Sequence, residues 1–205
     1  MSGAHEGRVD FAGLEISFDD RVLRPRPWTE EQARWGRDLL ACLPPGPVLE
    51  LCSGAGQIGL AGVAGTDREL VCVELDPTAA DYAEQNARTA GLDHRVEVRR
   101  GHFQEVLRPG ERFPLVIADP PWVASDETAR FPQDPQLAID GGADGLAVAL
   151  ACLDTIEQHL AADGAALLQL GSAEQVVDLM SRGPGSLRCR EVRTFQGGAV
   201  AHLTG

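Results

Sequence analysis

The sequence predicts an α/β protein with a mostly parallel β-sheet and helices on both of its faces. Apolar runs of strand length alternate with helical patterns from residue 29 onward, which is typical of successive β-α units. No internal repeat, low-complexity tract or Pro/Ser-rich linker interrupts that alternation. A chain of 205 residues that is 43% hydrophobic is long enough to form a single core. We therefore expect one domain, in which residues 1–28 form an N-terminal arm or hairpin and residues 29–205 form the sheet with its helices.

Each expected element follows from periodicity and from its start and stop signals. The residues from Phe11 to Leu23 alternate loosely, so they predict a hairpin or arm before the turn at Pro25-Arg26-Pro27. Thr29-Glu30-Glu31-Gln32 has the form of a capping box, which predicts that Thr29 caps a helix that ends at Pro44-Pro45. Further strands are expected at residues 47–52, 69–75, 95–100, 114–119, 164–170 and 187–204, the last as two strands around Gly197-Gly198. Helices are expected at residues 57–63, 77–90, 145–161 and 173–181.

Composition and charge exclude several classes of protein. No apolar run approaches the roughly 20 residues that span a bilayer, and the start MSGAHEGRVD lacks the features of a signal peptide, so we expect a cytoplasmic protein. The five cysteines are odd in number and form no CxxC pair, so neither a disulfide framework nor a metal site is expected. The net charge of −13 repels phosphate, which disfavours nucleic acid as a partner.

The most informative segment is Asp119-Pro120-Pro121-Trp122, which directly follows the apolar run at residues 114–118. It places acceptor oxygens and a flat aromatic ring at the end of an expected buried strand. A planar amide or amino nitrogen is a poor nucleophile until acceptors hold its hydrogens, and Asp119 and the Pro120 carbonyl are suited to hold them. Trp122 would then stack on the substrate plane. On its own, the tetrapeptide is explained equally well as a turn with a packed tryptophan.

A long connection, from Trp122 to Ala143, follows this segment. A loop of that length in a compact domain is usually a lid or a binding loop. In an open α/β sheet, ligands lie beyond the carboxyl ends of the strands. Because this loop leaves from such an end, we interpret it as a lid.

A glycine-rich turn follows the first strand of the expected sheet. Residues 54–59, Gly-Ala-Gly-Gln-Ile-Gly, satisfy G-x-G-x-x-G, and Glu74 ends the next strand. This pattern also fits a dinucleotide site, in which Glu74 would bind a ribose. Glu50, however, lies just before the turn, where a carboxylate repels a pyrophosphate but attracts a sulfonium or ammonium cation. The chain also has no lysine and no Tyr-x-x-x-Lys motif for hydride transfer, so a dehydrogenase is disfavoured.

From Val22 to Gly171 the sequence resembles the class I S-adenosylmethionine-dependent methyltransferases, and within them the HemK/PrmC-like protein-glutamine methyltransferases. The segments that carry the resemblance are VLRPRPWTE at residues 22–30, ELCSGAG at 50–56, VELDP at 73–77, DPPW at 119–122 and LAIDGGADGL at 137–146. The fourth stands where the family has NPPY, and the last is close to the family's LALDGGxDGL, which makes it the most specific. The resemblance implies a Rossmann-like class I methyltransferase domain, with a seven-stranded sheet and a short N-terminal arm.

The resemblance also implies the cofactor and the roles of single residues. The cofactor is S-adenosyl-L-methionine, and the product is S-adenosyl-L-homocysteine. Cofactor binding is assigned to Pro27, Thr29, Glu50, Cys52, Gly54, Gly56, Glu74, Leu75, His102, Phe103 and Asp119. The expected catalytic residues are Asp119, Pro120 and Trp122, and the expected substrate-binding residues are Trp28, Pro121, Trp122 and Asp140.

Three residues depart from the family. Cys52 replaces the first loop glycine, which is tolerable where φ is negative. His102 stands where the family usually has an acid that accepts from the adenine amino group. An imidazolium cannot accept, so we predict that cofactor affinity falls as His102 protonates; alternatively, His102 faces solvent while Phe103 packs over the adenine. Asp119 replaces an asparagine and only accepts when ionised, which leaves specificity for glutamine open.

The expected function is N-methylation of a planar amide or amino nitrogen, first of all in a protein glutamine side chain as in release factors. The alternatives are a small-molecule N-methyltransferase of secondary metabolism, an adenine amino-group methyltransferase on RNA or DNA, where DPPW also occurs, and a cofactor-free binding scaffold. Bacterial release-factor methyltransferases carry an N-terminal helical domain, whereas only a short segment precedes Val22 here. The resemblance therefore implies a small activator subunit or a small substrate, and no membrane partner.

Overall fold

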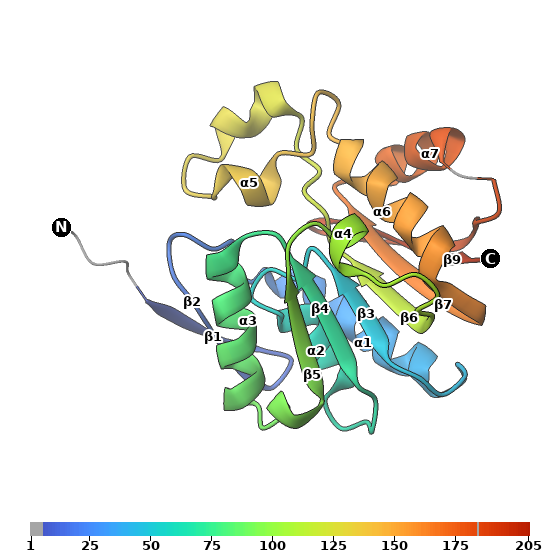
Figure 1. Ribbon diagram of the computed structural model, residues 1–205. Helices are drawn as coiled ribbons and strands as arrows, with labels where there is room; N and C mark the ends of the chain where they lie inside the picture. Colours follow the sequence, from blue (N-terminus) through green and yellow to red (C-terminus); the bar gives the residue numbers. More distant parts are fainter. Residues whose placement is uncertain (1–5, 184) are drawn as a thin grey trace.

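The computed structural model describes residues 6–183 and 185–205, and a seven-stranded sheet forms the centre of the fold (Figure 1). The strand order is β5-β4-β3-β6-β7-β9-β8. The first five strands in this order are parallel, and β9 is antiparallel to both of its neighbours. The strands are β3 (Val48–Leu51), β4 (Leu70–Glu74), β5 (Val96–Arg100), β6 (Phe113–Ala118), β7 (Leu160–Leu170), β8 (Arg188–Phe195) and β9 (Gly198–Thr204). The predicted mostly parallel sheet is confirmed, with its last two strands on either side of the expected glycine turn.

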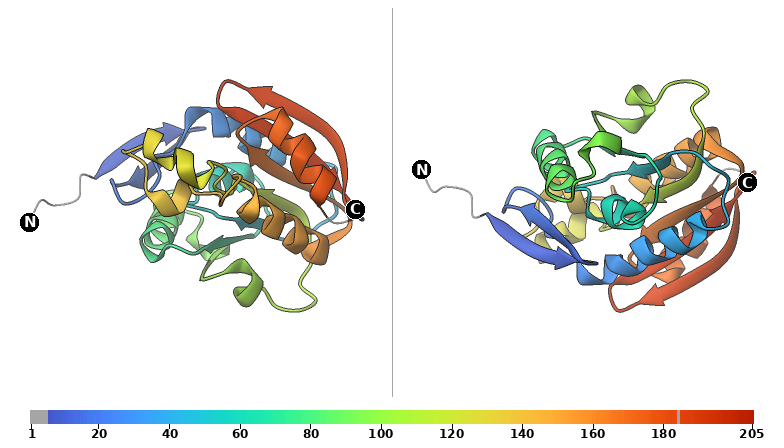
Figure 2. Two further views of the ribbon diagram at one scale, coloured as in Figure 1. Left: turned by 90° about the horizontal axis from the view of Figure 1, so that it is seen from above. Right: turned by 90° about the horizontal axis from the view of Figure 1, so that it is seen from below.

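Helices cover both faces of this sheet (Figure 2). One face carries α1 (Glu30–Leu40), α2 (Gln57–Val63) and α3 (Pro77–Thr89). The other face carries α4 (Phe103–Val106), α6 (Ala147–His159) and α7 (Ala173–Arg182). The long helices match the expected ranges closely. The sequence did not indicate α4, because a helix of four residues shows no periodicity.

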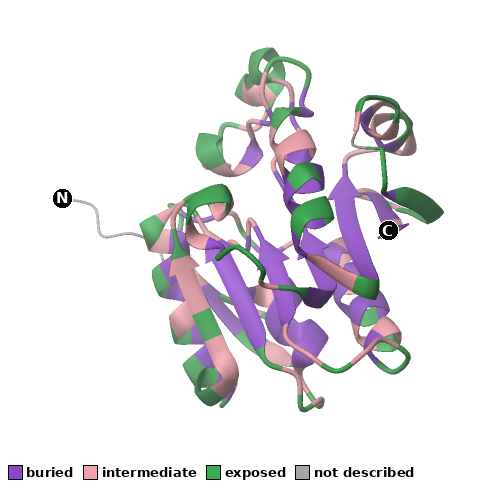
Figure 3. Cartoon of the chain, turned by 45° about the vertical axis from the view of Figure 1, so that its right-hand side comes forward, coloured by how far each residue is buried: buried purple, intermediate pink, exposed green. Residues whose placement is uncertain are grey.

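The hydrophobic core lies in two layers, one on each side of the sheet. All residues of β3 and β6 are buried (Figure 3). Neighbouring side chains of a strand point to opposite faces, so Leu49 and Leu51 pack with α6 while Val48 packs on the side of α1 and α2. Because the central strands are buried and largely apolar, with Glu50 of β3 and Gln169 of β7 as buried polar residues, most polar groups gather in the loops at the strand ends.

A separate hairpin precedes the sheet. Strands β1 (Gly7–Phe11) and β2 (Leu14–Phe18) pair antiparallel, so the hairpin begins earlier than the expected segment from Phe11 to Leu23. The part of the expected N-terminal arm at residues 1–5 lies outside the described residues. Asn86 of α3 accepts from the Ser17 amide (2.8 Å) and donates to the carbonyls of Ser17 (3.0 Å) and Ala55 (2.9 Å). One buried amide therefore attaches the hairpin to the glycine loop.

The predicted capping box at the start of α1 is wrong. Thr29 lies in a 3₁₀ turn (Pro27–Thr29), and its hydroxyl donates to the Arg26 carbonyl (2.9 Å) rather than accepting from a helix amide. Gln32 does not reach back to Thr29. It is fully buried, and its Nε2 donates to the carbonyls of Ala118 (3.0 Å) and Leu167 (3.1 Å) on β6 and β7. A contact with the sheet therefore replaces the local cap that the sequence pattern suggested.

The segment that follows Trp122 is ordered rather than structureless. It contains the 3₁₀ helix η3 (Ser125–Arg130) and the short helix α5 (Gln136–Ile139). Its two ends are joined at the base, where the Val123 amide donates to Ile139 (3.0 Å) and the Val123 carbonyl accepts from Gly141 (2.8 Å). Residues 123–142, which we call the flap, lie beyond the carboxyl ends of the strands (Figure 1). Their position agrees with a lid.

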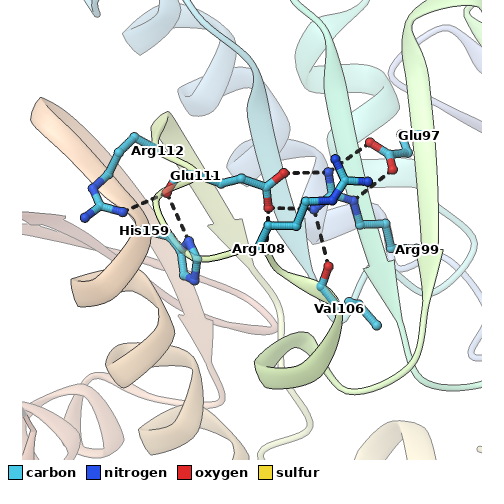
Figure 4. A network of polar contacts seen from close by, with 7 residues as sticks. All are labelled: Glu97, Arg99, Val106, Arg108, Glu111, Arg112 and His159. Carbon is cyan, nitrogen blue, oxygen red and sulfur yellow. Dashed lines mark hydrogen bonds and ion pairs between the residues drawn. The ribbon is translucent and has the colours of Figure 1, made fainter.

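A network of charged side chains lies beside the amino end of β6 (Figure 4). Arg99 of β5 donates to both oxygens of Glu111 (2.7 and 2.8 Å) and also pairs with Glu97 (2.9 Å). Only 10% of the Arg99 side chain is exposed. The Arg99 guanidinium lowers the pKa of Glu111 to about 2. Because the Glu111 carbonyl also contacts His159 Nδ1 (3.1 Å), the network joins β5, the loop before β6 and α6.

Candidate active site

Two cavities open at the carboxyl ends of the central strands and meet at Asp119. The first, which we call the glycine-loop cavity, has a volume of about 370 Å³ and is bordered by the loops after β3, β4 and β5. The second, the tryptophan cavity, has a volume of about 320 Å³ and lies between Trp28, Trp122 and the flap. Asp119 and Pro121 line both cavities. A group bound in one cavity would therefore meet a group bound in the other at the end of β6.

The loop between β3 and α2 follows a left-handed backbone path beside the first cavity. The φ angle is 54° at Gly54 and 80° at Gly56, where a Cβ atom would come within 3.2 Å of Ala83 Cβ. The φ angle is also positive at Cys52, at 56°. The condition under which cysteine was expected to be tolerable is therefore not met, and this backbone costs a non-glycine residue roughly 1–2 kcal/mol. The Cys52 side chain packs against the core on the α6 side.

Glu74 connects the first two loops of the glycine-loop cavity. One carboxylate oxygen accepts from the Gly54 amide (2.6 Å), and the other accepts from the Asp76 amide (2.8 Å). Burial raises the pKa of Glu74, against the effect of these two donors. Each oxygen keeps a free lone pair, so the carboxylate can also accept from the hydroxyls of a ribose.

The glycine-loop cavity has an excess of acidic groups. Glu74, Asp76, Asp119 and Asp140 line it, whereas Arg21 and the exposed His102 are its basic residues. Gln57 also lines it, and the Gln57 Oε1 atom is buried without a hydrogen-bond donor among the described residues. A buried acceptor without a partner costs about 1–3 kcal/mol, so a bound donor would stabilise this wall. The cavity thus fits a ligand that carries positive charge and N–H or O–H donors.

Glu50 does not take the position that was predicted for it. It does not line either cavity and points beneath α2, where its carboxylate accepts from the Gly59 amide (2.9 Å) and contacts the Cys72 thiol (3.4 Å). Burial raises the pKa of Glu50 to about 8. A Cβ atom on Gly59 would come within 2.3 Å of this carboxylate. Glu50 therefore supports the glycine loop from below, and its assignment to cofactor binding stays a prediction.

Asp119 has one polar partner among the described residues. Gln169, which is 2% exposed on β7, donates from Nε2 to Asp119 Oδ1 at 3.0 Å. Burial raises the pKa of Asp119 to about 7, and the Gln169 hydrogen bond lowers it. The Pro120 carbonyl accepts no hydrogen bond from residues 6–183 or 185–205. Two acceptors, Asp119 Oδ2 and Pro120 O, are thus available at the junction of the cavities.

Two tryptophans form walls of the tryptophan cavity, and each lies against a glycine. A Cβ atom on Gly171 would come within 2.5 Å of the Trp122 ring, and one on Gly197 within 2.3 Å of the Trp28 ring. The backbone of Trp122 is fixed as well, because its carbonyl accepts from Gln175 Nε2 (3.0 Å). Packing against these glycines therefore holds both rings in place.

The segment at residues 140–145 packs against the backbone of Pro121 and Trp122. Asp140 accepts from the Ser125 hydroxyl (2.7 Å) and the Gly142 amide (2.9 Å), and these bonds lower its pKa. A Cβ atom would collide with the Pro121 carbonyl at Gly141 (2.7 Å) and with the Trp122 carbonyl at Gly145 (2.4 Å). Asp140 lines the glycine-loop cavity, and its role in substrate binding stays a prediction. The two glycines Gly141 and Gly145 thus have a steric reason in this chain.

The structure gathers most of the predicted site residues. The tryptophan cavity is lined by Trp28, Thr29, Asp119, Pro120, Pro121 and Trp122. The glycine-loop cavity is lined by Cys52, Gly54, Glu74, Leu75, His102, Phe103, Asp119, Pro121 and Asp140. Outside both cavities lie Pro27, Glu50 and Gly56. Among residues 6–183 and 185–205, no cluster of His, Cys, Asp or Glu could hold a metal ion.

Among the polar residues of the two cavities that the sequence did not point to are Gln169, Gln57 and Arg26. Gln169 is an isolated glutamine within a strand, and Gln57 occupies a position of the glycine motif at which any residue is allowed. Arg26 forms an ion pair with Asp134 of the flap (2.5 Å), and both line the tryptophan cavity. The sequence indicates the turn at Pro25-Arg26-Pro27, but the partner of Arg26 lies 108 residues further along the chain. Only the fold reveals that pairing.

Comparisons with known proteins bear on this site. The family model described as "Conserved hypothetical protein 95" matches residues 34–133. The chain is 32% identical over 184 residues to the ribosomal protein uL3 glutamine methyltransferase of Bradyrhizobium diazoefficiens, a match that covers 83% of this chain and 57% of that protein. It is 30% identical over 146 residues to the release factor glutamine methyltransferase of Clostridium acetobutylicum, covering 68% of this chain and 51% of that protein. The chain thus spans little more than half the length of these relatives.

Solved structures with this fold include several methyltransferases. The hMettl16 catalytic domain in complex with the MAT2A 3′UTR hairpin 1 superposes with a TM-score of 0.72 at 17% identity, covering 95% of this chain and 75% of that one. A methyltransferase from Pyrococcus furiosus gives a TM-score of 0.68 at 18% identity, covering 93% and 88%. At such low identity these likenesses show the fold alone. The predicted class I fold is confirmed. In addition, no helix among the described residues is long and apolar enough to cross a membrane.

Proposed function

We propose that this chain, which is related to the HemK/PrmC-like class I methyltransferases over most of its length, is an S-adenosylmethionine-dependent methyltransferase acting on a planar amide nitrogen. The observation that carries the proposal is the shared wall of the two cavities. Asp119 lines both the glycine-loop cavity, which suits a cationic ligand, and the aromatic-walled tryptophan cavity. A methyl donor and its acceptor need such a common point, because transfer requires the reacting atoms to be about 3–3.5 Å apart.

The residues of the glycine-loop cavity fit S-adenosylmethionine. Glu74 has lone pairs for the ribose hydroxyls, and Phe103 offers an apolar surface for the adenine. The acidic lining attracts the sulfonium and ammonium groups. When bound, this cofactor supplies a methyl group on a positively charged sulfur. The protein's own contribution is to hold it and to place the acceptor beside it.

Three groups would hold the acceptor nitrogen in the tryptophan cavity. Asp119 Oδ2 and the Pro120 carbonyl can each accept one N–H, and hydrogen bonds to an ionised acceptor are roughly twice as strong as neutral ones. Trp122, fixed by Gly171 and Gln175, offers a flat surface for the amide plane. The nitrogen becomes acidic once it is methylated, so Asp119 or water can take the proton without a strong base.

Relatives of this chain are named for glutamine side chains of ribosomal protein uL3 and of release factors. A protein glutamine is therefore the first candidate for the acceptor. A small-molecule carboxamide is the second, because the tryptophan cavity of about 320 Å³ between Trp28, Trp122 and the flap is large enough for a small molecule. The small activator subunit and the cytoplasmic location stay predictions.

The proposal is tested by supplying methyl-labelled S-adenosylmethionine together with one class of acceptor at a time. The acceptors are a release factor, ribosomal protein uL3, small glutamine-like amides and oligonucleotides. We expect label on a side-chain amide nitrogen, located by mass spectrometry of the protein or amide. Failure of the chain to bind S-adenosylhomocysteine in calorimetry would refute the proposal. Label in the oligonucleotides alone would show that the acceptor is a nucleic acid and not a side-chain amide.

A further inference from the structure

Gln169 is the one polar side chain that contacts Asp119 among the described residues. It lies on β7, next to the strand that ends at Asp119, and it lines the tryptophan cavity while being only 2% exposed. Its Nε2 atom donates to Asp119 Oδ1 at 3.0 Å. An ionised carboxylate can only accept, so the nitrogen rather than the oxygen of this amide must face it. The contact thus fixes which way both side chains are oriented.

Each member of this pair keeps unused hydrogen-bonding capacity. Gln169 Nε2 carries two hydrogens, and the structure shows no second acceptor for it among residues 6–183 and 185–205. Asp119 Oδ2 likewise has no donor among these residues. The pair therefore has both an unused acceptor, Asp119 Oδ2, and an unused donor, the second N–H of Gln169, beside the same cavity. A single asparagine at position 119 would present the same two functions in one side chain.

We infer that Asp119 and Gln169 together read a primary carboxamide, and that Gln169 is a specificity-determining residue of the site. Asp119 Oδ2 accepts an N–H of the acceptor, while the second N–H of Gln169 donates to the acceptor's carbonyl oxygen. The hydrogen bond between Asp119 and Gln169 closes the ring of contacts. This inference rests on the proposed function, and it names the chemical class that the site selects.

This pair of Asp119 and Gln169, which we call the clamp, discriminates against methyl acceptors that carry other kinds of nitrogen. An alkylammonium has no acceptor for the Gln169 N–H, so this buried donor would stay unpaired. The amino group of adenine, next to its ring N1, has a donor and an acceptor in the same relation as an amide. The surroundings oppose a nucleotide, because Asp119 and Asp134 line this cavity and the chain carries a net charge of −13. Among the described residues, the one guanidinium that lines the cavity, that of Arg26, is paired with Asp134. We therefore assign the clamp to a carboxamide.

Binding measurements on the full chain saturated with S-adenosylhomocysteine test this inference. The probes are N-acetylglutamine methylamide, N-acetyllysine methylamide and adenosine, and their dissociation constants are measured by ligand-observed NMR. We expect the glutamine probe to bind and the other two to bind at least roughly tenfold more weakly, which is the effect of one unpaired buried group. In Gln169→Leu, which keeps the volume but removes the amide, the glutamine probe should lose roughly tenfold or more in affinity.

Two further variants separate recognition from folding. In the double variant Asp119→Asn/Gln169→Leu, the new amide supplies both a donor and an acceptor, so affinity for the glutamine probe should be largely restored. Gln158→Leu makes the same substitution at an exposed site on α6 and should leave the affinity unchanged. Affinity for S-adenosylhomocysteine and the melting temperature are measured for every variant.

The outcomes distinguish the clamp from the function as a whole. If S-adenosylhomocysteine binds but the glutamine probe does not, or if Gln169→Leu binds that probe as tightly as the unmodified chain does, the inference is wrong and the methyltransferase proposal survives. Preferential binding of adenosine likewise overturns it. If S-adenosylhomocysteine itself does not bind, the proposed function fails first.

Discussion

Strand β6 has a carboxylate near each end, and the two have opposite surroundings. Glu111, before the strand, is held by both arms of the Arg99 guanidinium, which lowers its pKa to about 2. Asp119, directly after the strand, has the neutral amide of Gln169 as its partner, and burial raises its pKa to about 7. The two groups are eight positions apart in the sequence, yet one strongly favours the ionised state and the other resists it.

The difference separates a structural carboxylate from one kept for a ligand. At the amino end of β6, Arg99 neutralises the charge of Glu111 within the fold. At the carboxyl end the nearby acidic groups, Glu50 and Glu74, also have pKa values raised by burial, and no arginine contacts Asp119 among the described residues. Such perturbed groups in a cavity are typical of functional sites. A cationic ligand would therefore supply the positive charge that Asp119 lacks in the free protein.

The largest expected effect is loss of methyl transfer when Asp119 is truncated. In Asp119→Ala, the acceptor N–H loses its charged partner, and we expect kcat to fall roughly 100-fold, the usual effect of removing one preorganised group in a site. The rate is measured with whichever acceptor takes the label, and S-adenosylhomocysteine affinity serves as the control. Full turnover in this variant would show that Asp119 is only a strand-ending residue.

The next effect concerns stability at the opposite end of β6. Glu111→Gln removes the charge that Arg99 pairs with, and we expect a loss of about 1–2 kcal/mol in the free energy of unfolding near neutral pH. The depressed pKa means that this stability is present above the ordinary pKa of glutamate and is lost as the pH falls toward about 2. Denaturant unfolding at several pH values measures it.

The control for that experiment is Glu69→Gln, an exposed carboxylate that forms no ion pair with the described residues. It should change stability by less than about 0.5 kcal/mol at any pH. Equal effects of the two substitutions would mean that the Arg99 network contributes no more than a solvated charge.

A smaller effect of opposite sign is expected from Asp119→Asn. Because burial raises the pKa of Asp119 from 3.8 to about 7, this carboxyl costs no stability below its ordinary pKa, and the cost grows as the pH rises to about 7. We expect the variant without ligand to be more stable than the unmodified chain by about 1 kcal/mol near pH 8, and by clearly less near pH 5. Thermal unfolding at both pH values measures this. Equal stability at both pH values would mean that Asp119 is solvated in the free protein.

Much of the fold was predictable because its signals are local. The apolar runs of β3 and β6, the glycine turn after β3 and the DPPW segment each carry their evidence within a few residues. What the sequence could not indicate depends on distant partners. Thr29 and Gln32 match a capping box in isolation, but buried carbonyls of β6 and β7 hold Gln32 instead.

The candidate site shows the same division. The position of Asp119, Glu74 and Trp122 follows from where strands end, and these residues do line the cavities. Glu50 does not line the cavities because alternation along β3 turns its side chain beneath α2, a direction that spacing alone does not show. Gln169 could have been noticed only as a single polar residue in an otherwise apolar strand.

The central claim, that Asp119 is left without a cation so that it can face a cationic cofactor, is tested most directly by comparing two ligands. S-adenosylmethionine carries a positive sulfur and S-adenosylhomocysteine does not. Their dissociation constants are measured by calorimetry from about pH 5.5 to about pH 8.5, across the pKa of Asp119 of about 7. We predict that the preference for the cationic ligand grows by roughly tenfold over this range, as expected for one nearby opposite charge, and that Asp119→Asn abolishes the change. A preference that is the same at every pH in the unmodified chain would contradict the claim.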